Sequence, residues 1–364
     1  MSDLSTVISI VPRLPKAIDG VGDYALNLAR QLRKDFNIQT QFIVGNPEWK
    51  GELELEGFPI NQVVDSSSDQ LTSFLEGDRT SPVLLHYVGY GYANRGCPVW
   101  LIKGLQRWKN LYPDRILVTM FHELYASGTP PWTSSFWLSP LQKKLVTRLA
   151  KLSDRCITSN QDYAESLYRL NLNPKKAIVT LPIFSTIGEP NYLPSPLERT
   201  KRLVVFGHKN SRKQVYQQCL VELEQISQSL NIEEIYDIGA STGLTLSDII
   251  SIPILEKGII EASEIREIFK DSLVGFLNFP PPKYLAKSSV FATYCAHGLI
   301  PCMVHASATP IDGLEMNKHY FSTIYKSNKL SLEAGYEIAN HAHAWYETHN
   351  LSAQAKIFTK YLNH

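Results

Sequence analysis

The residues with the clearest chemical potential lie together in the last third of the chain. Lys287, Ser288 and Ser289 stand before a predicted short helix that Gly298 ends. A helix N-terminus presents free backbone N–H groups and the positive end of the helix dipole, so it attracts anions. A lysine and two hydroxyl groups add a charge and donors that a phosphate would use. Serines also begin many helices as ordinary caps, and that is the alternative.

A glycine-containing segment near the N-terminus is a second candidate. Gly20, Val21 and Gly22 precede a helical pattern over 23–34, at the end of an expected loop over 12–22. They do not match the G-x-G-x-x-G spacing of a dinucleotide site, so NAD is not expected. The glycines allow either the close approach of a diphosphate or only a tight turn before the helix.

Basic residues gather after a predicted strand in the second half. Lys209, Arg212 and Lys213 lie near the start of a predicted helix. Cations at the positive end of a helix dipole are unfavourable unless an anion compensates them. A nucleoside diphosphate leaving group needs such charge, because negative charge develops on it in the transition state. The alternative is a set of solvated residues at a helix start.

A histidine follows a predicted buried strand in the first half. Phe121, His122 and Glu123 follow the strand expected at 116–120. Ligands gather at the carboxyl ends of parallel strands. His122 could bind a sugar hydroxyl, while Glu123 fixes its tautomer or contacts an acceptor. A purely structural histidine is the alternative.

Strands alternate with helices along the whole chain, which predicts a parallel, doubly wound α/β sheet in each half. Strands are expected at 7–11, 40–44, 83–87, 116–120, 156–159, 177–181, 203–206, 234–238, 274–278 and 300–304. Helices are expected at 23–34, 99–111, 140–152, 161–170, 215–230, 261–270, 331–349 and 351–362.

A linker separates the two halves. Three prolines and a glycine fall between positions 188 and 196, a composition that indicates a linker. We expect a first Rossmann-like domain over 1–187, a linker over 188–200 and a second such domain over 201–340. The helices over 341–364 are expected to pack back on the first domain. Ligands would sit at the strand carboxyl ends, in a cleft between the domains.

Composition narrows the class of protein. The chain has 364 residues, with 36 Lys and Arg against 35 Asp and Glu, and this balance predicts that nucleic acid is not a partner. Its five cysteines are scattered without a C-x-x-C pair, as in reduced cytoplasmic proteins. No signal peptide or membrane span is read. No Asp-x-Asp occurs, and neither a metal nor another cofactor is expected.

Two predicted helices are basic and amphipathic. One carries Lys103, Arg107 and Lys109, and the other carries Lys143 to Lys151. Solvated helix faces are the main interpretation. Peripheral association with the inner face of a membrane is the minority alternative.

Several short motifs together resemble the GT-B glycosyltransferases, in particular the retaining, metal-independent group called family four. The stretch 19–24 stands where that family has its N-terminal glycine loop, and His122 stands where it has a histidine after a mid-domain strand. Gly207 and His208 match its Gly-Arg pair, and Lys213 follows His208 by five residues, as the family's lysine follows its arginine. The resemblance runs in order along nearly the whole chain.

The resemblance implies a GT-B fold and transfer of a sugar from a nucleoside diphosphate donor, with UDP favoured. The acceptor would be a glycan or a lipid-linked saccharide. The catalytic residues would be His122 and Glu123. The donor phosphates would be bound by Gly20, Val21, Gly22, His208, Arg212, Lys213, Lys287, Ser288 and Ser289. The nucleoside would lie near Gly258, Ile259 and Thr293.

The sequence departs from the family in two places. His208 replaces the arginine, with Lys209 and Arg212 close enough to supply charge. The family's paired glutamates, which contact the sugar and the ribose, are missing; their places fall near Leu285 and at Thr293. A nucleotide-sugar epimerase of the GT-B fold and a non-catalytic nucleotide-sugar-binding protein are therefore the alternatives.

A segment of the first half gives a narrower resemblance. The stretch His86 to Tyr92, followed by Gly96, Cys97 and Pro98, is similar to bacterial, notably cyanobacterial, members that belong to polysaccharide gene clusters. This resemblance implies a role in polysaccharide or exopolysaccharide biosynthesis.

Overall fold

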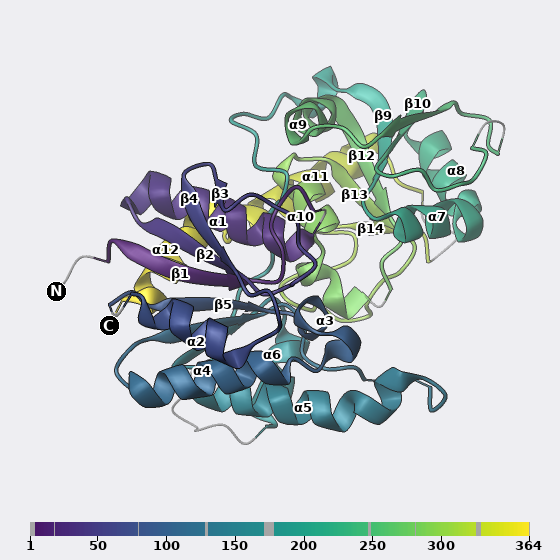
Figure 1. Cartoon of the computed structure of the whole chain (residues 1–364). Coiled ribbons are helices and arrows are strands. Elements are labelled where there is room, and N and C mark those ends of the chain that lie inside the picture. The colour runs from purple at the N-terminus through teal and green to yellow at the C-terminus, as the bar shows by residue number, and fades with distance from the viewer. Residues whose placement is uncertain are drawn as a thin grey trace. The chain divides into compact units, whose positions relative to one another are not determined.

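A computed structural model describes residues 4–17, 19–78, 80–127, 130–170, 178–246, 249–280, 282–324 and 329–363. The chain forms two compact units (Figure 1). Unit 1 contains Met1–Leu181 together with Leu351–His364, and unit 2 contains Pro182–Asn350.

The sheet of unit 1 has eight strands. Their spatial order is β3 (Glu54–Leu55), β4 (Phe58–Gln62), β2 (Gln39–Val44), β1 (Thr6–Val11), β5 (Val83–Tyr87), β6 (Leu117–Phe121), β7 (Arg155–Thr158) and β8 (Ile178–Thr180). All neighbours are parallel except β3 and β4. Every residue of β5 and β6 is buried, which explains why these strands read as continuous apolar runs.

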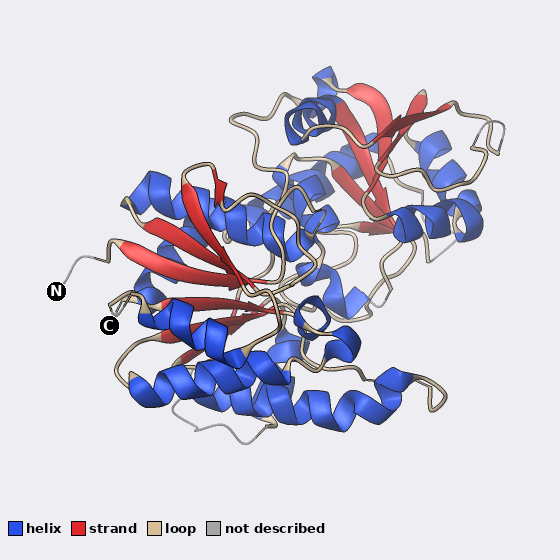
Figure 2. Cartoon of the chain, viewed as in Figure 1, coloured by secondary structure: helices blue, strands red, loops and turns tan. Residues whose placement is uncertain are grey.

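Helices cover both faces of this sheet (Figures 1 and 2). On one face, α1 (Gly20–Phe36) packs against α12 (Leu351–Leu362), and its apolar side chains join those of β1 and β2. On the other face lie α2 (Ser68–Glu76), α4 (Val99–Leu111) and α5 (Ser134–Leu152). The remaining helical elements are α3 (Gly89–Tyr92), η1 (Asn94–Gly96) and α6 (Gln161–Tyr168).

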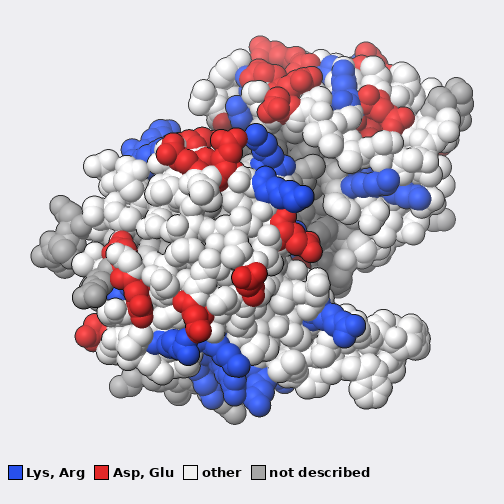
Figure 3. All heavy atoms as spheres, in the orientation of Figure 1, with Lys and Arg blue, Asp and Glu red and all other residues white. Residues whose placement is uncertain are grey.

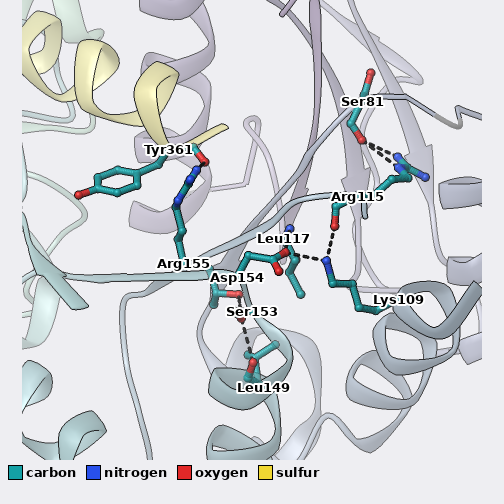
Figure 4. A network of polar contacts seen from close by, with 10 residues as sticks. Ser81, Lys109, Arg115, Leu117, Leu149, Ser153, Asp154, Arg155 and Tyr361 are labelled. Atoms are coloured by element: carbon teal, nitrogen blue, oxygen red, sulfur yellow. Dashed lines mark hydrogen bonds and ion pairs between the residues drawn. The ribbon is translucent and has the colours of Figure 1, made fainter. Parts of the chain in front are cut away.

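A polar network at the amino ends of the strands fastens α12 to unit 1 (Figure 4). The Arg155 guanidinium donates to the backbone carbonyl of Tyr361. Next to it, the Asp154 carboxylate accepts a hydrogen bond from Lys109 at 2.7 Å. Arg115 donates to the carbonyl of Ser81 at 2.6 Å. These bonds lie at the edge opposite the strand carboxyl ends, so they stabilise the scaffold rather than a ligand site.

The sheet of unit 2 is fully parallel. Its spatial order is β11 (Ile254–Gly258), β10 (Glu234–Ile238), β9 (Thr200–Phe206), β12 (Ser272–Leu277), β13 (Ile300–Met303) and β14 (Phe321–Ser322). The strand order reverses between β9 and β12. In open parallel sheets, the carboxyl ends beside such a reversal form the usual ligand position.

Alternate residues of the strands in unit 2 pack against helices on opposite faces of the sheet. Leu203 and Val205 of β9 face a core shared with α7 (Lys209–Gln218), α8 (Leu220–Ser229) and α11 (Leu332–Glu347). On the other face, Phe206 meets Phe269 of α9 (Ala262–Asp271) at 5.3 Å between ring centroids. Phe269 in turn contacts Tyr294 of α10 (Ser289–Ala296). The short helices η2 (Pro196–Glu198) and η3 (Pro282–Lys287) complete the unit.

The predicted α/β class with two parallel sheets is confirmed, and several element bounds need correction. Helix α1 begins at Gly20, because Asp19 caps it, so the loop expected to end at 22 is shorter. The single helix expected over 215–230 is two helices that meet at Cys219, whose backbone is not helical. Helix α5 begins at Ser134, and Pro140 lies inside it rather than at its start. Position 177 lies outside the described residues.

The division of the chain also differs from the expected bounds. Unit 2 begins at Pro182, and the segment expected as a linker over 188–200 belongs to it. Tyr346 of α11 explains this placement, since its hydroxyl donates to Glu189 and accepts from the Ser185 N–H at 3.0 Å. Helix α11 therefore stays in unit 2. Helix α12 belongs to unit 1, where Gln354 accepts from the Tyr24 hydroxyl at 2.6 Å.

Candidate functional site

Two helices of unit 2 begin side by side at the carboxyl edge of its sheet. Strand β9 ends at Phe206, Gly207 turns the chain with a φ of +119°, and His208 caps α7. A Cβ atom on Gly207 would lie 2.8 Å from a methyl group of Val290, in the first turn of α10. Only glycine permits this approach without displacement of α10. The positive ends of α7 and α10 therefore lie close together beside the strand-order reversal.

The start of α7 carries positive charge that no acidic side chain compensates. Its first turn contains no Asp or Glu, and its cap is the Nδ1 atom of His208, which accepts from the Asn210 N–H at 3.3 Å. Lys213 is half-buried there. Neither Lys209 nor Lys213 forms an ion pair or hydrogen bond with any residue that the structure describes. This arrangement favours a bound anion.

Arg212 has a different role from the one predicted for it. Its side chain is 1% exposed and forms an ion pair with the buried Asp237 of β10. Its Nε donates to the carbonyl of Gly207 at 3.0 Å, and its second terminal nitrogen donates to the carbonyl of Ala240. Tyr216 adds a bond to Asp237 at 2.9 Å. Arg212 thus joins the loops that follow β9 and β10, and all three of its nitrogens already have partners inside the unit.

The start of α10 keeps one of its two predicted serines available. Ser288 is buried, and its Oγ caps the helix by accepting from the Phe291 N–H at 3.2 Å. Ser289 is half-buried. Lys287 lies over the ring of Tyr284, with 5.6 Å between the ammonium nitrogen and the ring centroid. The charge and the helix end predicted for an anion are therefore present at this edge of unit 2.

The three residues predicted near the nucleoside separate into two groups. Gly258 ends β11 with a φ of +68°, and its carbonyl accepts from the Gly239 N–H at 2.9 Å. Ile259 follows it and is 67% exposed, so an apolar surface is available at the end of β11. Thr293 is buried inside unit 2, where its hydroxyl contacts the Ser289 carbonyl at 2.7 Å and Ser185 at 3.2 Å. The structure does not bring Thr293 to that surface.

In unit 1, the predicted glycine loop is the first turn of α1. The Asp19 carboxylate accepts from the N–H groups of Val21 at 2.9 Å and Gly22 at 3.1 Å. Asp19 therefore occupies the donors that a phosphate would use. A Cβ atom on Gly22 would lie 2.3 Å from the carbonyl oxygen of Arg13, so close packing explains this glycine. Gly20 is exposed, and the space beside it is open.

A second carboxyl group makes this helix end more acidic. Asp23 lies in the same turn, and burial, together with the nearby Asp19 charge, raises its pKa to about 6. A cation is present nearby, since Arg13 lies 3.6 Å from the Asp19 carboxylate. The positive end of α1 is thus compensated by its own side chains, in contrast to that of α7.

His122 lies where the sequence placed it, directly after β6, but it is buried in a cluster of rings. Its Nε2 lies 3.1 Å from Nδ1 of His86 in β5. The Tyr24 ring meets it edge-on, with 5.0 Å between centroids. Burial lowers the pKa of His86 to about 3, so His86 is neutral at physiological pH. This neutral partner fixes the orientation of the His122 ring, while Glu123 is exposed beside it.

Sequence reasoning missed four members of these sites. His86 and Tyr24 lie inside a strand and a helix, where their apolar neighbours make them look like core residues. In unit 2, Asn278 follows β12 and lies 3.0 Å from His305, which follows β13. Their positions just after two strands are a signal that could have found them, because strand carboxyl ends collect ligands.

A groove of about 1070 Å³ lies on the outer helices of unit 1. Figure 3 shows Lys and Arg side chains gathered over α4 and α5. The groove is lined by basic and apolar side chains, among them Lys103, Arg107, Arg148, Lys151, Val99, Ile102 and Leu145. In the first turn of α5, outside the groove, Trp137 is 72% exposed. Such a surface suits an anionic partner with apolar parts.

The described residues include no cluster of three or more His, Cys, Asp or Glu side chains that could hold a metal ion. No helix in the described ranges is long and apolar enough to cross a membrane.

The chain matches no protein-family model and none of the curated proteins with which it was compared. It does match solved structures over its whole length. An α-glucosyltransferase in complex with UDP-glucose and DNA has a TM-score of 0.61 and 11% identity, with 100% of both chains covered. The pneumococcal O-GlcNAc transferase GtfA, in complex with UDP and GlcNAc, has a TM-score of 0.58 and 10% identity over 98% of both chains.

A third match is an α,α-trehalose-phosphate synthase (UDP-forming) from Burkholderia xenovorans. Its TM-score is 0.57 and its identity 12%, with 98% of this chain and 99% of that chain covered.

The prediction that excluded nucleic acid from the partners is wrong. Three of the structures that match are α-glucosyltransferases in complex with DNA, and they cover 98–100% of this chain. The balanced net charge was the basis of the exclusion. Net charge sums over the whole surface, so it does not report a local basic surface such as the one on α4 and α5.

The fold prediction is confirmed by the three matches with the glucosyltransferase, the O-GlcNAc transferase and the trehalose-phosphate synthase. All three reported matches cover nearly all of both chains, which includes both parallel sheets. The first is described in complex with UDP-glucose, the second in complex with UDP, and the third as UDP-forming. The chain has the GT-B glycosyltransferase fold.

Proposed function

We propose that this protein is a glycosyltransferase that moves a sugar from a nucleoside diphosphate sugar, UDP-sugar in the first place, to an acceptor. The proposal includes transfer with retention, independence of metal ions and the absence of a bound cofactor. It also includes a place in family four, among the bacterial and notably cyanobacterial members of polysaccharide biosynthesis. A cytoplasmic location follows from the same proposal.

One observation carries the proposal most directly. At the carboxyl edge of unit 2, two helix N-termini lie together with Lys213, which has no counter-ion among the described residues. A diphosphate would supply the missing negative charge. Lys213 and Lys209 would hold the phosphates, aided by the N–H groups of α10 and by Ser289. Their charge would then stabilise the leaving diphosphate as the glycosidic bond breaks.

The proposed mechanism follows from the side chains at the two positions where the resembling family has glutamates. Leu285 and Thr293 have no carboxylate and are buried, so neither can act as a nucleophile. Attack by the acceptor on the same face as the departing diphosphate is therefore the proposed route to retention, with a phosphate oxygen taking the acceptor proton. His122 and Glu123 are proposed to bind the glycosyl group or the acceptor, and Gly258 and Ile259 the nucleoside.

The direct test measures release of nucleoside diphosphate from donor sugar. Thermal-shift screening against UDP, GDP and ADP comes first, because a ligand of the folded state raises its melting temperature. Coupled assays with the nucleotide that binds, in excess EDTA, then measure turnover with glycan and lipid-linked acceptors. No thermal shift with any nucleotide would contradict the proposal. A need for added Mg²⁺ or Mn²⁺ would contradict its metal independence.

The same assay separates the alternatives. A nucleotide-sugar epimerase would convert the donor into a second nucleotide sugar without an acceptor, which chromatography of the donor detects. A non-catalytic nucleotide-sugar-binding protein would show the thermal shift but release no diphosphate under any acceptor condition.

A nucleic-acid acceptor is the second candidate, favoured by the DNA complexes of the α-glucosyltransferases. The basic face of α5, formed by Lys144, Arg148 and Lys151, could bind either nucleic acid or an anionic membrane that holds a lipid-linked acceptor. A variant with Lys144, Arg148 and Lys151 changed to Glu, against Lys34→Glu on α1 as control, is tested for binding to duplex DNA and to phosphatidylglycerol vesicles. Whichever partner the triple variant loses and the control keeps identifies the acceptor class.

A further inference from the structure

A polar pair joins the ends of two neighbouring strands in unit 2. Asn278 follows β12 and His305 follows β13 by two residues, and their side chains meet with 3.0 Å between His305 Nε2 and Asn278 Oδ1. Asn278 is only 7% exposed, and the other atom of its amide has no hydrogen-bond partner among the described residues and is not fully buried. The pair therefore keeps unused hydrogen-bonding groups at the surface.

The chemistry of these unused groups does not depend on how the hydrogens are assigned. If His305 Nε2 donates to the Asn278 carbonyl, the neutral ring keeps an acceptor at Nδ1 and the amide keeps a donor. If the Asn278 amide is turned over, the ring keeps a donor and the amide keeps an acceptor. In both cases the pair presents one donor and one acceptor. A hydroxyl group, which both donates and accepts, complements it.

The position of the pair points to the glycosyl part of a donor. The parallel register of β9 and β12, continued by one residue beyond Leu277, puts Asn278 level with Gly207, across the strand-order reversal. Gly207 leads directly into the His208 cap and the free cations of α7. The surface proposed for the nucleoside, at Ile259, lies at the end of β11, on the opposite side of β9. Phosphates held at β9 and α7 would therefore direct the sugar toward β12 and β13.

The pair also supplies polar groups at a sheet edge where the glutamates expected from the resemblance are missing. The positions near which the resemblance places sugar- and ribose-binding glutamates hold Leu285 and Thr293, and both side chains are buried. Neither can reach a sugar hydroxyl. Asn278 and His305 supply neutral polar groups on the adjacent strand ends instead.

We propose that Asn278 and His305 form a subsite that binds a hydroxyl group of the transferred sugar in the donor. This inference rests on the proposed function, because it assumes a nucleoside diphosphate sugar at the edge of unit 2. It makes the pair a determinant of sugar specificity rather than of nucleotide affinity.

The test compares a nucleoside diphosphate with its glucose ester by calorimetry. The thermal-shift panel of UDP, GDP and ADP selects the nucleotide, and dissociation constants for both ligands are measured on the parent protein, Asn278→Ala, His305→Ala and His305→Gln. Loss of one hydrogen bond to the sugar should weaken the ester by about 3- to 10-fold and leave the diphosphate unchanged. His305→Gln keeps a partner for Asn278 and thus the fold, but it lacks the second ring nitrogen, so it should lose ester affinity as well.

His341→Ala serves as the matched control, because His341 is an exposed histidine on α11 of the same unit. It should change neither constant. Equal weakening of both ligands in the Asn278 and His305 variants would show a structural role and overturn the subsite. Unchanged constants for both ligands would overturn it too. Failure of the parent to bind any nucleotide is a different result, and it overturns the proposed function itself.

Discussion

The first helix of each unit begins after the first strand of its sheet core, yet the two starts carry opposite charge. At α1, Asp19 bonds the N–H groups of Val21 and Gly22, and Asp23 adds a second carboxyl group. At α7, the cap is a histidine, and Lys209 and Lys213 stand without acidic partners among the described residues. The two starts share a position in equivalent folds, and only their side chains differ.

The side chains at each start determine which helix end is available to an anion. A carboxylate at a helix N-terminus satisfies the free N–H groups and the dipole, so the site is already filled. A cation there is unfavourable unless a ligand brings the opposite charge. The phosphate site that we propose therefore lies at α7, and the start of α1 has a structural role, although the glycines of α1 stand out first in the sequence.

The largest expected effect concerns Arg212, the one basic residue at α7 that the comparison treats as structural. Arg212→Met leaves the buried Asp237 without its counter-ion, which should lower the free energy of unfolding by about 3–5 kcal/mol. Chemical denaturation measures this. The control is Lys201→Met, whose ion pair with Glu233 is exposed and should contribute less than about 1 kcal/mol. A stable Arg212→Met protein that no longer binds nucleotide would instead make Arg212 a phosphate ligand.

Lys213→Ala should weaken binding of nucleoside diphosphate by about 1–3 kcal/mol, because it removes a charged hydrogen-bond donor from the phosphates. Titration calorimetry with the nucleotide chosen by thermal shift measures the change. Asp19→Asn at α1 is the matched variant, and it should leave the affinity unchanged. If Asp19→Asn strengthened binding while Lys213→Ala had no effect, the assignment of the two helix starts would be reversed.

His122→Ala tests whether unit 1 contributes to the reaction although its helix start is filled. Loss of a contact with the reacting sugar should cut transfer by about tenfold to a hundredfold and leave nucleotide affinity nearly intact. Turnover per folded molecule and melting temperature are measured on the same sample. Normal turnover with a lowered melting temperature would make His122 a packing residue of the ring cluster formed with His86 and Tyr24.

The smallest effect is the pH dependence of α1. The pKa of Asp23 is raised from 3.8 to about 6 in the folded protein, so the protonated form favours the fold. Its contribution to stability is complete below pH 3.8 and is lost as the pH rises through 6. Asp23→Asn stays neutral and should be more stable than the parent by about 1–2 kcal/mol at pH 7.5, with no gain near pH 4. Melting curves at the two pH values measure this, and an equal gain at both would exclude titration of Asp23 as the cause.

Much of the fold could be read from the sequence because buried parallel strands are short apolar runs. Strand β10 over Glu234–Ile238 and helices α4 over Val99–Leu111 and α12 over Leu351–Leu362 have the predicted bounds. Elements without such a signal were missed. The edge strand β4 over Phe58–Gln62 alternates burial only partly, and α2 over Ser68–Glu76 is one short amphipathic helix among polar residues.

The candidate site was likewise only partly predictable from the sequence. Residue type and position near a strand end were enough to single out Lys213 and His122 as candidates, because both follow apolar runs. They were not enough to separate Lys213 from Arg212, which stand next to each other in the sequence. Burial beside Asp237 makes Arg212 a structural residue, and that contact joins residues 25 positions apart.

Two α/β sheets, with basic residues after the first strand of the second, could be predicted from the sequence because local periodicity and residue type carry that information. Which charged groups have partners could be seen only in the folded chain. Pairing depends on side chains that the chain brings together from distant strands: Arg212 with Asp237, His122 with His86, and Asn278 with His305. A counter-ion at hydrogen-bond distance decides whether a polar residue stabilises the fold or remains available to a ligand.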